Sequence, residues 1–353
     1  MNFLRTLAFP FALLYGLAVW FRNKLFNAGI LRQSAFDIPV ISVGNLSAGG
    51  TGKTPHIEYL VRLLAPYKKH LSTLSRGYGR KTSGFVLAGS ECNPAEIGDE
   101  PCQFVKNFPG LRVAVDEKRT RGIKHLLALD PPSDCILLDD AYQHRYVKPG
   151  LSILLTDYFH PYYEDYLLPT GMLRESRRGA RRADIIVVSK CPPILSPITR
   201  NSILHKIKPA ANQHVYFSFL RYGDLQPMNP ANNPVPENDH KFYGILLLAG
   251  IANTYPLEEH LKRKCIDLEV CKFPDHHSYS REDLLKIREK FCNIVGKNKV
   301  IITTEKDRMK LELPELKEIL KDLPVFYQPI EVDFFKDDKT WFDKQILEYA
   351  GKN

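Results

Sequence analysis

The stretch PVISVGNLSAGGTGKT, residues 39–54, decides the fold. A short β-branched run, Val40–Val43, leads into a glycine-rich turn, and a helical pattern follows from His56 to Leu64. The glycines at positions 49, 50 and 52 allow positive φ angles and let backbone N–H groups approach phosphate oxygens. The helix that follows points its positive end at the same anion. The stretch therefore predicts a strand, a phosphate-binding loop and a helix.

The residues expected to hold the nucleotide are those of the loop: Ser47, Ala48, Gly49, Gly50, Thr51, Gly52, Lys53 and Thr54. Lys53 is expected to reach the β- and γ-phosphates, and the hydroxyl of Thr54 to bind Mg²⁺. The strict pattern G-x4-G-K-[ST] has glycine where this chain has Ser47. A glycine-rich turn with a chance Lys-Thr pair is the alternative. The loop indicates a nucleoside triphosphate, but not its use.

Composition is that of an ordinary globular protein, with 44% hydrophobic and 25% charged residues. The length of 353 residues predicts two domains. A formal net charge of +9 is compatible with nucleic acid, acidic lipid or a phosphorylated substrate. The seven cysteines are scattered and include no CxxC pair, which argues against a zinc ribbon or a disulfide framework and indicates reduced thiols.

The N-terminal segment 6–21, TLAFPFALLYGLAVWF, is apolar and uncharged. It is shorter than the roughly 20 residues of a membrane-spanning helix, and Pro10 interrupts it. A signal peptide and a single spanning anchor are two interpretations. The favoured third one is a helix that lies in the membrane interface, with Arg22 and Lys24 on anionic lipid.

Short apolar strands alternate with helical stretches from Phe36 to about Phe219, which predicts an α/β domain with a parallel sheet and helices on both faces. Ligands of such sheets bind at the carboxyl ends of the strands. The expected strands are 40–43, 71–75, 113–115, 135–138, 153–156 and 185–189.

A Pro- and Asn-rich loop, 225–239, separates this domain from a second, smaller α/β domain. Its expected elements are strands 245–248, 268–273 and 300–303 and a helix around 281–295. Segments 214–222 and 325–332 are expected to form a two-stranded connector. The expected division is 1–32 for the membrane-associated helix, 33–217 for the P-loop domain and 218–353 for the second domain with its connector.

The apolar run SDCILLDD, residues 133–140, ends in two carboxylates. Paired with the phosphate loop, such a buried strand delivers Asp139 and Asp140 to the nucleotide's Mg²⁺. By itself the run is weak, because many strands end in Asp as a turn residue. His144 follows closely, as a substrate contact or a structural histidine.

Other polar motifs follow predicted strands or lie in loops. SRGYGR at 75–80 suits an anion or is a basic surface turn, and GDEP at 98–101 is an acid–base site or a polar turn. LPTGMLRE at 168–175, followed by four arginines, suits phosphate or acidic headgroups or is a solvated helix face. FPDHH at 273–277 and TTEKD at 303–307 are dense in ionisable groups, and the two histidines suggest a metal without an obvious third ligand.

The chain resembles the tetraacyldisaccharide 4′-kinases, the lipid A 4′-kinases of Gram-negative bacteria. The resemblance extends from the N-terminal helix to about residue 311. It is carried by seven motifs in this order: SVGNLSAGGTGKTP, SRGYGR, GDEP, LLDDAYQHR, LPTGMLRE, FPDHH and TTEKD. Ser47 is no departure within this family, whereas Ala141 stands where glycine is common and Cys102 is unexpected.

The resemblance implies a kinase that uses ATP and Mg²⁺ to phosphorylate the 4′-hydroxyl of tetraacyldisaccharide 1-phosphate, forming lipid IVA. It also implies a peripheral or monotopic protein on the anionic cytoplasmic face of the inner membrane, with the lipid A disaccharide precursor as partner, no nucleic acid and no obligate protein partner. The implied catalytic residues are Asp99 as base, His276 as its partner, Lys53, Arg119, Asp139, Asp140, His144 and Glu175.

Two other classes of function fit parts of the sequence. A P-loop GTPase or ATPase that acts as a switch or metallochaperone would use His276 and His277 as metal ligands. A non-enzymatic protein that binds membranes or nucleic acid would use the net positive charge of the chain. This interpretation leaves the phosphate loop and the GDEP motif unexplained. Acceptor-dependent phosphoryl transfer, measured against simple hydrolysis, separates these classes from a kinase.

Overall fold

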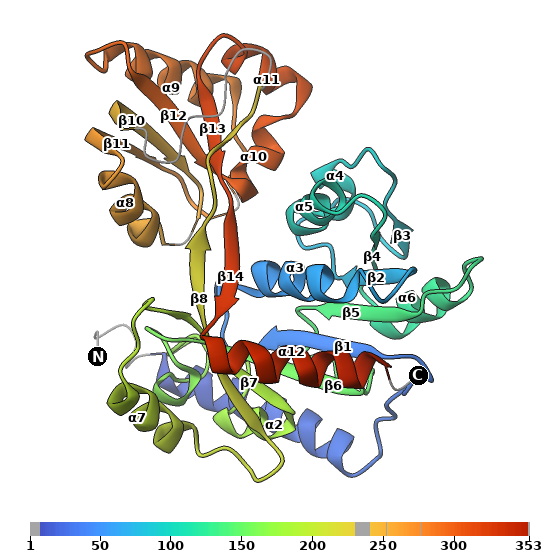
Figure 1. Cartoon of the computed structure of the whole chain (residues 1–353). Coiled ribbons are helices and arrows are strands. Elements are labelled where there is room, and N and C mark those ends of the chain that lie inside the picture. The colour runs from blue at the N-terminus through green and yellow to red at the C-terminus, as the bar shows by residue number, and fades with distance from the viewer. Residues whose placement is uncertain (1–7, 230–240, 252, 276, 352–353) are drawn as a thin grey trace. The chain divides into compact units, whose positions relative to one another are not determined.

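The computed structural model describes residues 8–229, 241–251, 253–275 and 277–351, which form two compact units (Figure 1). Unit 1 consists of the described parts of residues 1–221 and 332–353, and unit 2 of those of residues 222–331. The predicted pair of α/β domains is therefore present. The predictions for His276 and for residues 230–239 of the Pro- and Asn-rich loop lie outside the described residues.

Unit 1 is built on a nine-stranded sheet in which β1 is central. In spatial order the strands are β14 (Ile330–Phe334), β8 (His214–Tyr222), β7 (Ile185–Cys191), β6 (Leu151–Asp157), β1 (Val40–Asn45), β5 (Cys135–Asp139), β2 (Leu71–Ser75), β4 (Arg112–Val115) and β3 (Val86–Leu87). The neighbours from β8 to β4 are parallel, and β3 runs antiparallel to β4. The six predicted strands of this sheet are confirmed.

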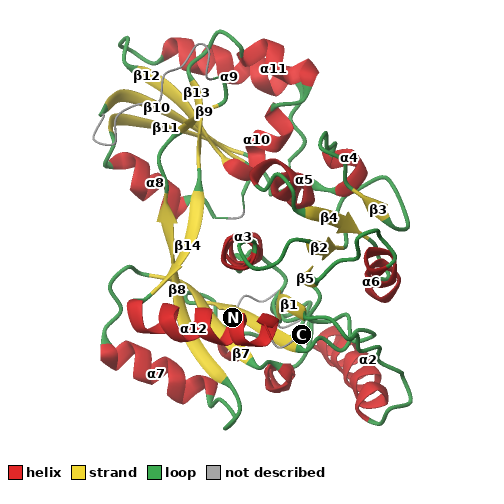
Figure 2. Ribbon diagram, turned by 45° about the vertical axis from the view of Figure 1, so that its right-hand side comes forward, coloured by secondary structure: helices red, strands yellow, loops and turns green. Residues whose placement is uncertain are grey.

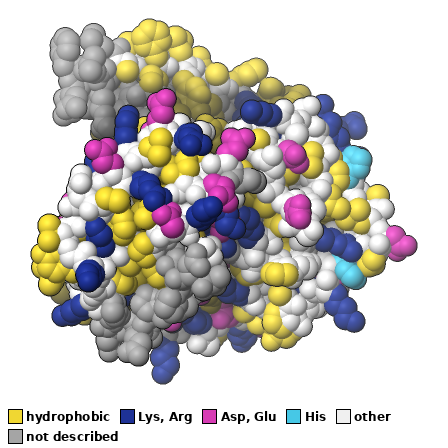
Figure 3. All heavy atoms as spheres, turned by 90° about the horizontal axis from the view of Figure 1, so that it is seen from above, with side chains coloured by type: hydrophobic (Ala, Val, Ile, Leu, Met, Phe, Trp, Pro, Cys, Tyr) yellow, Lys and Arg dark blue, Asp and Glu magenta, His cyan; other side chains and the backbone are white. Residues whose placement is uncertain are grey.

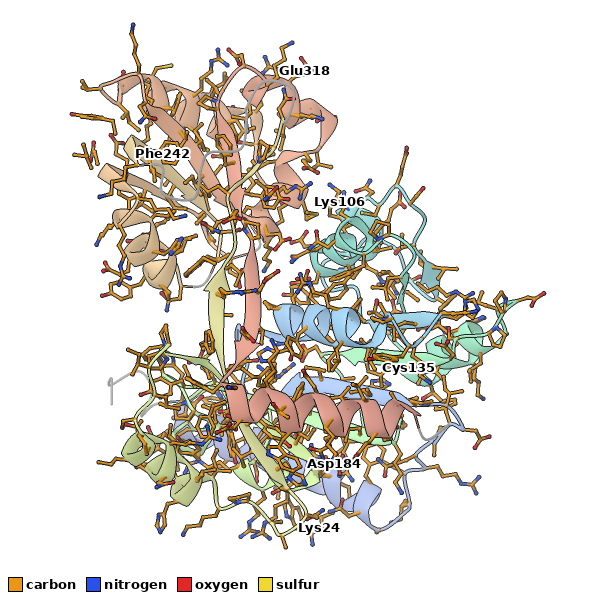
Figure 4. The ribbon with its side chains drawn as sticks, viewed as in Figure 1. Lys24, Lys106, Cys135, Asp184, Phe242 and Glu318 are labelled. Carbon is orange, nitrogen blue, oxygen red and sulfur yellow. The ribbon has the colours of Figure 1, made fainter. Side chains whose placement is uncertain are left out.

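Helices cover both faces of this sheet, as predicted (Figure 1). One face packs against α3 (Lys53–Leu64), α5 (Asp99–Asn107) and α12 (Lys336–Gly351). The other packs against α6 (Arg119–Leu127) and α7 (Pro197–Ile207). The strands are continuous apolar runs because both of their faces are buried. Cys135, labelled in Figure 4, starts β5 inside this core.

Helix α2 (Phe9–Asn27) lies on unit 1 with two contrasting sides. Ala12 and Phe26 are buried, and the Phe26 ring meets the Tyr146 ring edge-on at 5.1 Å. The opposite side is apolar and exposed, and it comprises Phe9, Phe11, Leu13, Leu14, Leu17, Trp20 and Phe21. None of the described helices is both long enough and apolar enough to cross a membrane.

Unit 2 contains a five-stranded sheet between two layers of helices (Figure 2). Its strands, in spatial order, are β11 (Cys265–Lys272), β10 (Phe242–Ala249), β12 (Lys299–Thr304), β13 (Val325–Gln328) and β9 (Gln226–Pro227). α8 (Tyr255–Lys262) covers one face. The other face packs against α9 (Arg281–Asn293), α10 (Glu305–Leu311) and α11 (Pro314–Leu320). The three predicted strands and the predicted helix of this unit are confirmed.

The predicted assignment of residues 218–353 to one domain differs from the structure at the C-terminal end. β14 is a neighbour of β8 in the sheet of unit 1. Phe342 and Ile346 of α12 are buried in the core of the same unit. The chain therefore leaves unit 1 after β8, forms unit 2 and returns. The predicted connector segment 325–332 is divided, because β13 belongs to the sheet of unit 2.

Candidate active site

The register of the parallel strands brings the predicted motifs to one edge of the sheet. Val43 of β1 lies beside Asp139 of β5, Leu74 of β2 beside Leu138, and Ser75 beside Val115 of β4. The loops that follow these strands consequently leave the sheet side by side. The order of the strands along the chain also changes direction at β1: β2 to β5 lie on one side of it and β6 to β8 on the other. Doubly wound sheets bind ligands at the carboxyl edge of the sheet at such a point.

The phosphate loop connects the end of β1 to the first turn of α3. Gly49 and Gly52 have φ angles of +145° and +82°, which side-chain-bearing residues rarely adopt. Lys53 is the first residue of α3, so it and Thr54 lie at the positive end of this helix. The loop is held from outside, because the amide of Ala48 donates to the carbonyl of Met172 over 2.6 Å. These features suit an anionic phosphate chain.

Asp140 is the acidic centre of a cluster of cations at this edge. Its carboxylate accepts two hydrogen bonds from the Arg174 guanidinium, at 3.1 and 2.8 Å, and lies 3.7 Å from Lys53 Nζ. Although burial acts to raise it, these two cations hold the pKa of Asp140 below its ordinary value. The Lys53 ammonium also lies 3.5 Å from Oδ1 of Asn45. Lysine and acid are therefore together, as the sequence predicted.

Asp139 has an environment that fits a cation. Its side chain is 6% exposed, and within the described part of the chain its Oδ1 is buried without a hydrogen-bond partner. Burial, with the charge of Asp140 beside it, raises the pKa of Asp139 to about 7. A buried carboxylate oxygen without a donor suits an oxygen-seeking ion such as Mg²⁺. Asp139, Asp140 and Thr54 are therefore a fitting set of donors for that ion.

Arg119 contacts Asp139, and His144 contacts Arg119. The Arg119 guanidinium donates to the backbone carbonyls of Asp116 (2.7 Å) and Asp139 (3.2 Å), and its backbone amide donates to Nε2 of His144 (3.3 Å). Burial lowers the pKa of Arg119 to about 10, so it stays charged at neutral pH. Burial and the charge of Arg119 lower the pKa of His144 to about 4, which keeps the imidazole neutral.

Asp99 is held at the same edge by a tight turn. It is the first residue of α5, after Gly98 with a φ angle of +98°. A Cβ atom on Gly98 would lie 3.0 Å from the carbonyl oxygen of Tyr78, in the loop that follows β2. The charge of Glu100 also raises the pKa of Asp139, so the first turn of α5 lies near this acid. The loop at 75–80 thus packs closely against the turn of the GDEP motif.

Glu175 is deeply buried, at 2% exposure, and is surrounded by donors. Its Oε1 accepts from Arg182 (2.8 Å) and Gln143 (3.1 Å), and its Oε2 from Asn23 of α2 (3.2 Å). Gln143 also donates to the backbone carbonyl of Asn45 over 2.8 Å. The described contacts of Glu175 therefore organise the loops around the phosphate loop.

The motifs of unit 2 are described in part, and His276 lies outside the described residues. His277 Nε2 lies 3.0 Å from the carboxylate of Asp283, and its ring stacks on Phe273 at 4.6 Å. In TTEKD, the Thr304 hydroxyl accepts from the amide of Asp307 at the start of α10. Asp307 itself is buried and accepts from the amide of Gly250 over 2.8 Å. This part of the motif stabilises the fold of unit 2.

Two residues that hold the phosphate loop escaped the sequence analysis. Lys190, at the carboxyl end of β7, donates to the carbonyl of Gly50 and pairs with Asp157 at 2.9 Å. His56 lies 2.6 Å from the Gly52 carbonyl through Nδ1 and 3.0 Å from the Ser218 hydroxyl through Nε2, and burial lowers its pKa to about 4. The strand-end position of Lys190 was a usable signal, whereas nothing near His56 indicated its second partner.

Comparison with known proteins gives one consistent answer. The family model of the tetraacyldisaccharide-1-P 4′-kinases matches residues 4–350. The tetraacyldisaccharide 4′-kinase of Flavobacterium johnsoniae is 47% identical, over 100% of this chain and 99% of the relative. That of Bacteroides thetaiotaomicron is 44% identical, over 98% of this chain and 93% of the relative.

A solved structure agrees with these relatives. The crystal structure of LpxK from Aquifex aeolicus in complex with ATP is 29% identical to this chain, with a TM-score of 0.73, and the match covers 98% of this chain and 99% of the other. The match extends across both units of the fold. With its phosphate loop, acid pair and chain-long similarity, this chain belongs to the tetraacyldisaccharide 4′-kinase family.

Proposed function

We propose that this chain transfers the γ-phosphoryl group of ATP to the 4′-hydroxyl of a tetraacyldisaccharide 1-phosphate, giving lipid IVA. The observation that carries the proposal is the gathering of Lys53, Asp139, Asp140 and Arg119 at the edge of the sheet that also holds the phosphate loop. Phosphoryl transfer needs mainly positioning and neutralisation of charge. Lys53 and Arg119 would supply positive charge directly, and Asp139 and Asp140 would supply it through a bound Mg²⁺.

Each group has a role that follows from its place. Lys53 and the amides of the phosphate loop would bind the phosphate chain, and Arg119 would remain charged to neutralise it. Mg²⁺ held by Thr54, Asp139 and Asp140 would supply further positive charge at the phosphates. Asp99 would take the proton of the sugar hydroxyl. The expected partnership of Asp99 with His276 stays a prediction.

The acceptor is a lipid, so the enzyme has to work at a membrane surface. Four acyl chains, at about 0.8 kcal/mol for each buried CH₂ group, hold the acceptor in the bilayer. The exposed apolar side of α2, with Leu14 and Leu17 near its centre, would enter the interface, and the exposed Lys24 would meet anionic headgroups. The expected contact of Arg22 with lipid would compete with its hydrogen bond to the Gln143 carbonyl. We infer a peripheral or monotopic protein on the cytoplasmic face of the inner membrane.

The test is incubation with γ-labelled ATP, Mg²⁺ and detergent-dispersed tetraacyldisaccharide 1-phosphate, followed by separation of the lipids. We expect label in a lipid product with one more phosphate. Release of labelled phosphate at the same rate with and without the acceptor would instead identify a nucleotide hydrolase, the class of the switch and metallochaperone alternatives.

A nucleic-acid binding protein is a weaker candidate for this basic chain. On the face drawn in Figure 3, Lys and Arg side chains are interspersed with Asp and Glu side chains. Binding to nucleic acid would depend steeply on salt concentration, and a filter-binding assay across a range of salt would detect it.

A further inference from the structure

We propose that Asn23 of α2 is a positioning residue for catalysis, because its hydrogen bond to Glu175 fixes the loops that shape the phosphate loop. This inference rests on the proposed kinase function. It gives α2 a second task that is independent of its exposed apolar side: the helix is part of the support of the active site.

The polar contacts of α2 end on segments that carry site residues. The Tyr15 hydroxyl donates to the backbone carbonyl of Arg174 over 2.7 Å, and Asn23 Nδ2 donates to Glu175 Oε2 over 3.2 Å. The Arg22 guanidinium donates to the backbone carbonyl of Gln143. The contacts thus reach two neighbouring site segments, one after β5 and the other at the LRE motif. Lys24, labelled in Figure 4, is exposed on the same helix.

Glu175 connects Asn23 to the phosphate loop through a chain of hydrogen bonds. Gln143 Nε2 donates both to Glu175 Oε1 (3.1 Å) and to the carbonyl of Asn45 (2.8 Å). Asn45 Nδ2 in turn donates to the carbonyl of Gly49 over 3.3 Å. An altered orientation of the Glu175 carboxylate would therefore displace Gln143 and, with it, the start of the loop.

The Asn23 side chain is itself fixed from its other side. Arg145, which is buried, donates from one guanidinium nitrogen to the carbonyl of Asn23 (3.0 Å) and to its Oδ1 (3.3 Å). The other guanidinium nitrogen donates to Oδ1 of Asn27 over 2.8 Å. Asn23 and Asn27 thus share one partner on the same helix, and of the two, Asn23 is the residue that bonds to Glu175. Asn27 is therefore a matched control.

The experiment compares Asn23→Asp with Asn27→Asp. Both changes keep the side-chain shape and the acceptor for Arg145, but Asn23→Asp replaces the donor to Glu175 by a second carboxylate. With detergent-dispersed acceptor, we expect Asn23→Asp to lower kcat about tenfold or more, as a small displacement of catalytic groups does. The KM for the lipid should change by less than about twofold, since the apolar side of α2 is untouched. Asn27→Asp should keep kcat near that of the unchanged protein.

A pH profile separates positioning from simple loss of structure. The Asn23→Asp change puts a second carboxyl group beside that of Glu175, and protonation of either one restores an O–H donor to the other. The ratio of kcat for Asn23→Asp to that of the unchanged protein should therefore rise from about pH 8 to about pH 6. Asn23→Ala has no such group, and its ratio should stay flat.

Three outcomes overturn the proposal: equal loss of kcat in Asn23→Asp and Asn27→Asp, no loss in Asn23→Asp, or a pH-independent ratio for that variant. If Asn23→Asp does not fold, as judged by thermal unfolding, Asn23→Ala against Asn27→Ala decides by the same comparison of kcat. If the unchanged protein makes no labelled lipid, the proposed function itself fails and the inference falls with it. Normal labelling with an unaffected Asn23→Asp variant defeats the inference alone.

Discussion

At the scale of single residues, Asp99 carries the step of the proposed chemistry that one substitution tests most directly. Asp99→Asn keeps the shape of the side chain but cannot accept the sugar proton. We expect kcat to fall by about two to four orders of magnitude, the usual contribution of a general base. Affinity for ATP, measured by equilibrium binding, should stay near that of the unchanged protein, because the phosphate loop is intact.

Glu96→Gln is the control for this change, since Glu96 is exposed on α4 (Pro94–Ile97), directly before the Gly98 turn. It should leave kcat unchanged. Near-full activity of Asp99→Asn would show that another group takes the proton.

Sequence patterns predicted those site residues whose function can be inferred from a short motif around them. Lys53, Asp139 and Asp140 come from motifs that join a strand to a polar turn, and the structure brings them together. The strand-end position of Lys190 was a usable signal that was not followed, but its partner, Gly50, and the partner of His56, Ser218, lie far away in the sequence. No periodicity reveals such contacts before the chain is folded.

At the scale of elements, the turn before α5 links backbone geometry to catalysis. Gly98→Ala places a Cβ atom 3.0 Å from the Tyr78 carbonyl and forces a side-chain-bearing residue to a φ angle of +98°. Gly110, with a φ angle of +95°, has no atom within 4 Å of its added Cβ. Both Gly→Ala variants should lose about 1–3 kcal/mol of stability to backbone strain. We expect Gly98→Ala alone to lower kcat.

Denaturant unfolding measures the loss of stability of the two glycine variants, and lipid labelling measures their kcat. If Gly98→Ala and Gly110→Ala are equally active, the turn does not place Asp99.

The exposed side of α2 offers a test of membrane attachment. Leu14 and Leu17 are 67% and 61% exposed, and each apolar side chain fully removed from water contributes about 1.5–3 kcal/mol. The double change Leu14→Ser and Leu17→Ser should therefore greatly weaken co-sedimentation with anionic vesicles. Activity on detergent-dispersed acceptor should remain, because neither side chain faces the site loops.

Ile198→Ser is the control for the membrane test, because Ile198 is 83% exposed on α7. It should leave vesicle binding unchanged. Equal vesicle binding of the double Leu variant and the unchanged protein would contradict a role of α2 in attachment.

Helices were harder to predict from the sequence than strands. The buried strands are short apolar runs with clear ends, whereas α5 begins inside the polar GDEP motif. Because α5 has only 9 residues, its few apolar positions, among them Phe104, are not enough to reveal a helical period. The sequence also did not show that α2 contacts the site loops as well as exposing an apolar side, since Tyr15 and Asn23 form hydrogen bonds with those loops only in the folded chain.

At the scale of the whole molecule, one buried and two half-buried histidines predict sensitivity to acid. Burial lowers the pKa values of His56, His144 and His260 to about 4, from an ordinary value of 6.5. Between these two values the unfolded chain binds protons at these three histidines that the folded chain does not, and the three together outweigh Asp139, whose raised pKa acts in the opposite direction. The free energy of unfolding should therefore fall as the pH drops from about 6.5 to about 4.

Denaturant unfolding at a series of pH values measures this slope. His260→Gln in unit 2 should make it shallower, whereas His205→Gln, at an exposed position of α7, should leave it unchanged. If the free energy of unfolding depends on pH equally in His260→Gln and in the unchanged protein, the lowered pKa of His260 does not contribute to the sensitivity to acid.

The order of elements along the chain has a consequence for synthesis on the ribosome. β14 and α12, which complete the sheet and core of unit 1, are translated after the whole of unit 2. The nascent chain must therefore keep the earlier strands of unit 1 without their final neighbours while about a hundred further residues emerge. Apolar strands such as β1 and β6 are exposed to misassembly during that interval, which gives chaperones a defined period in which to act.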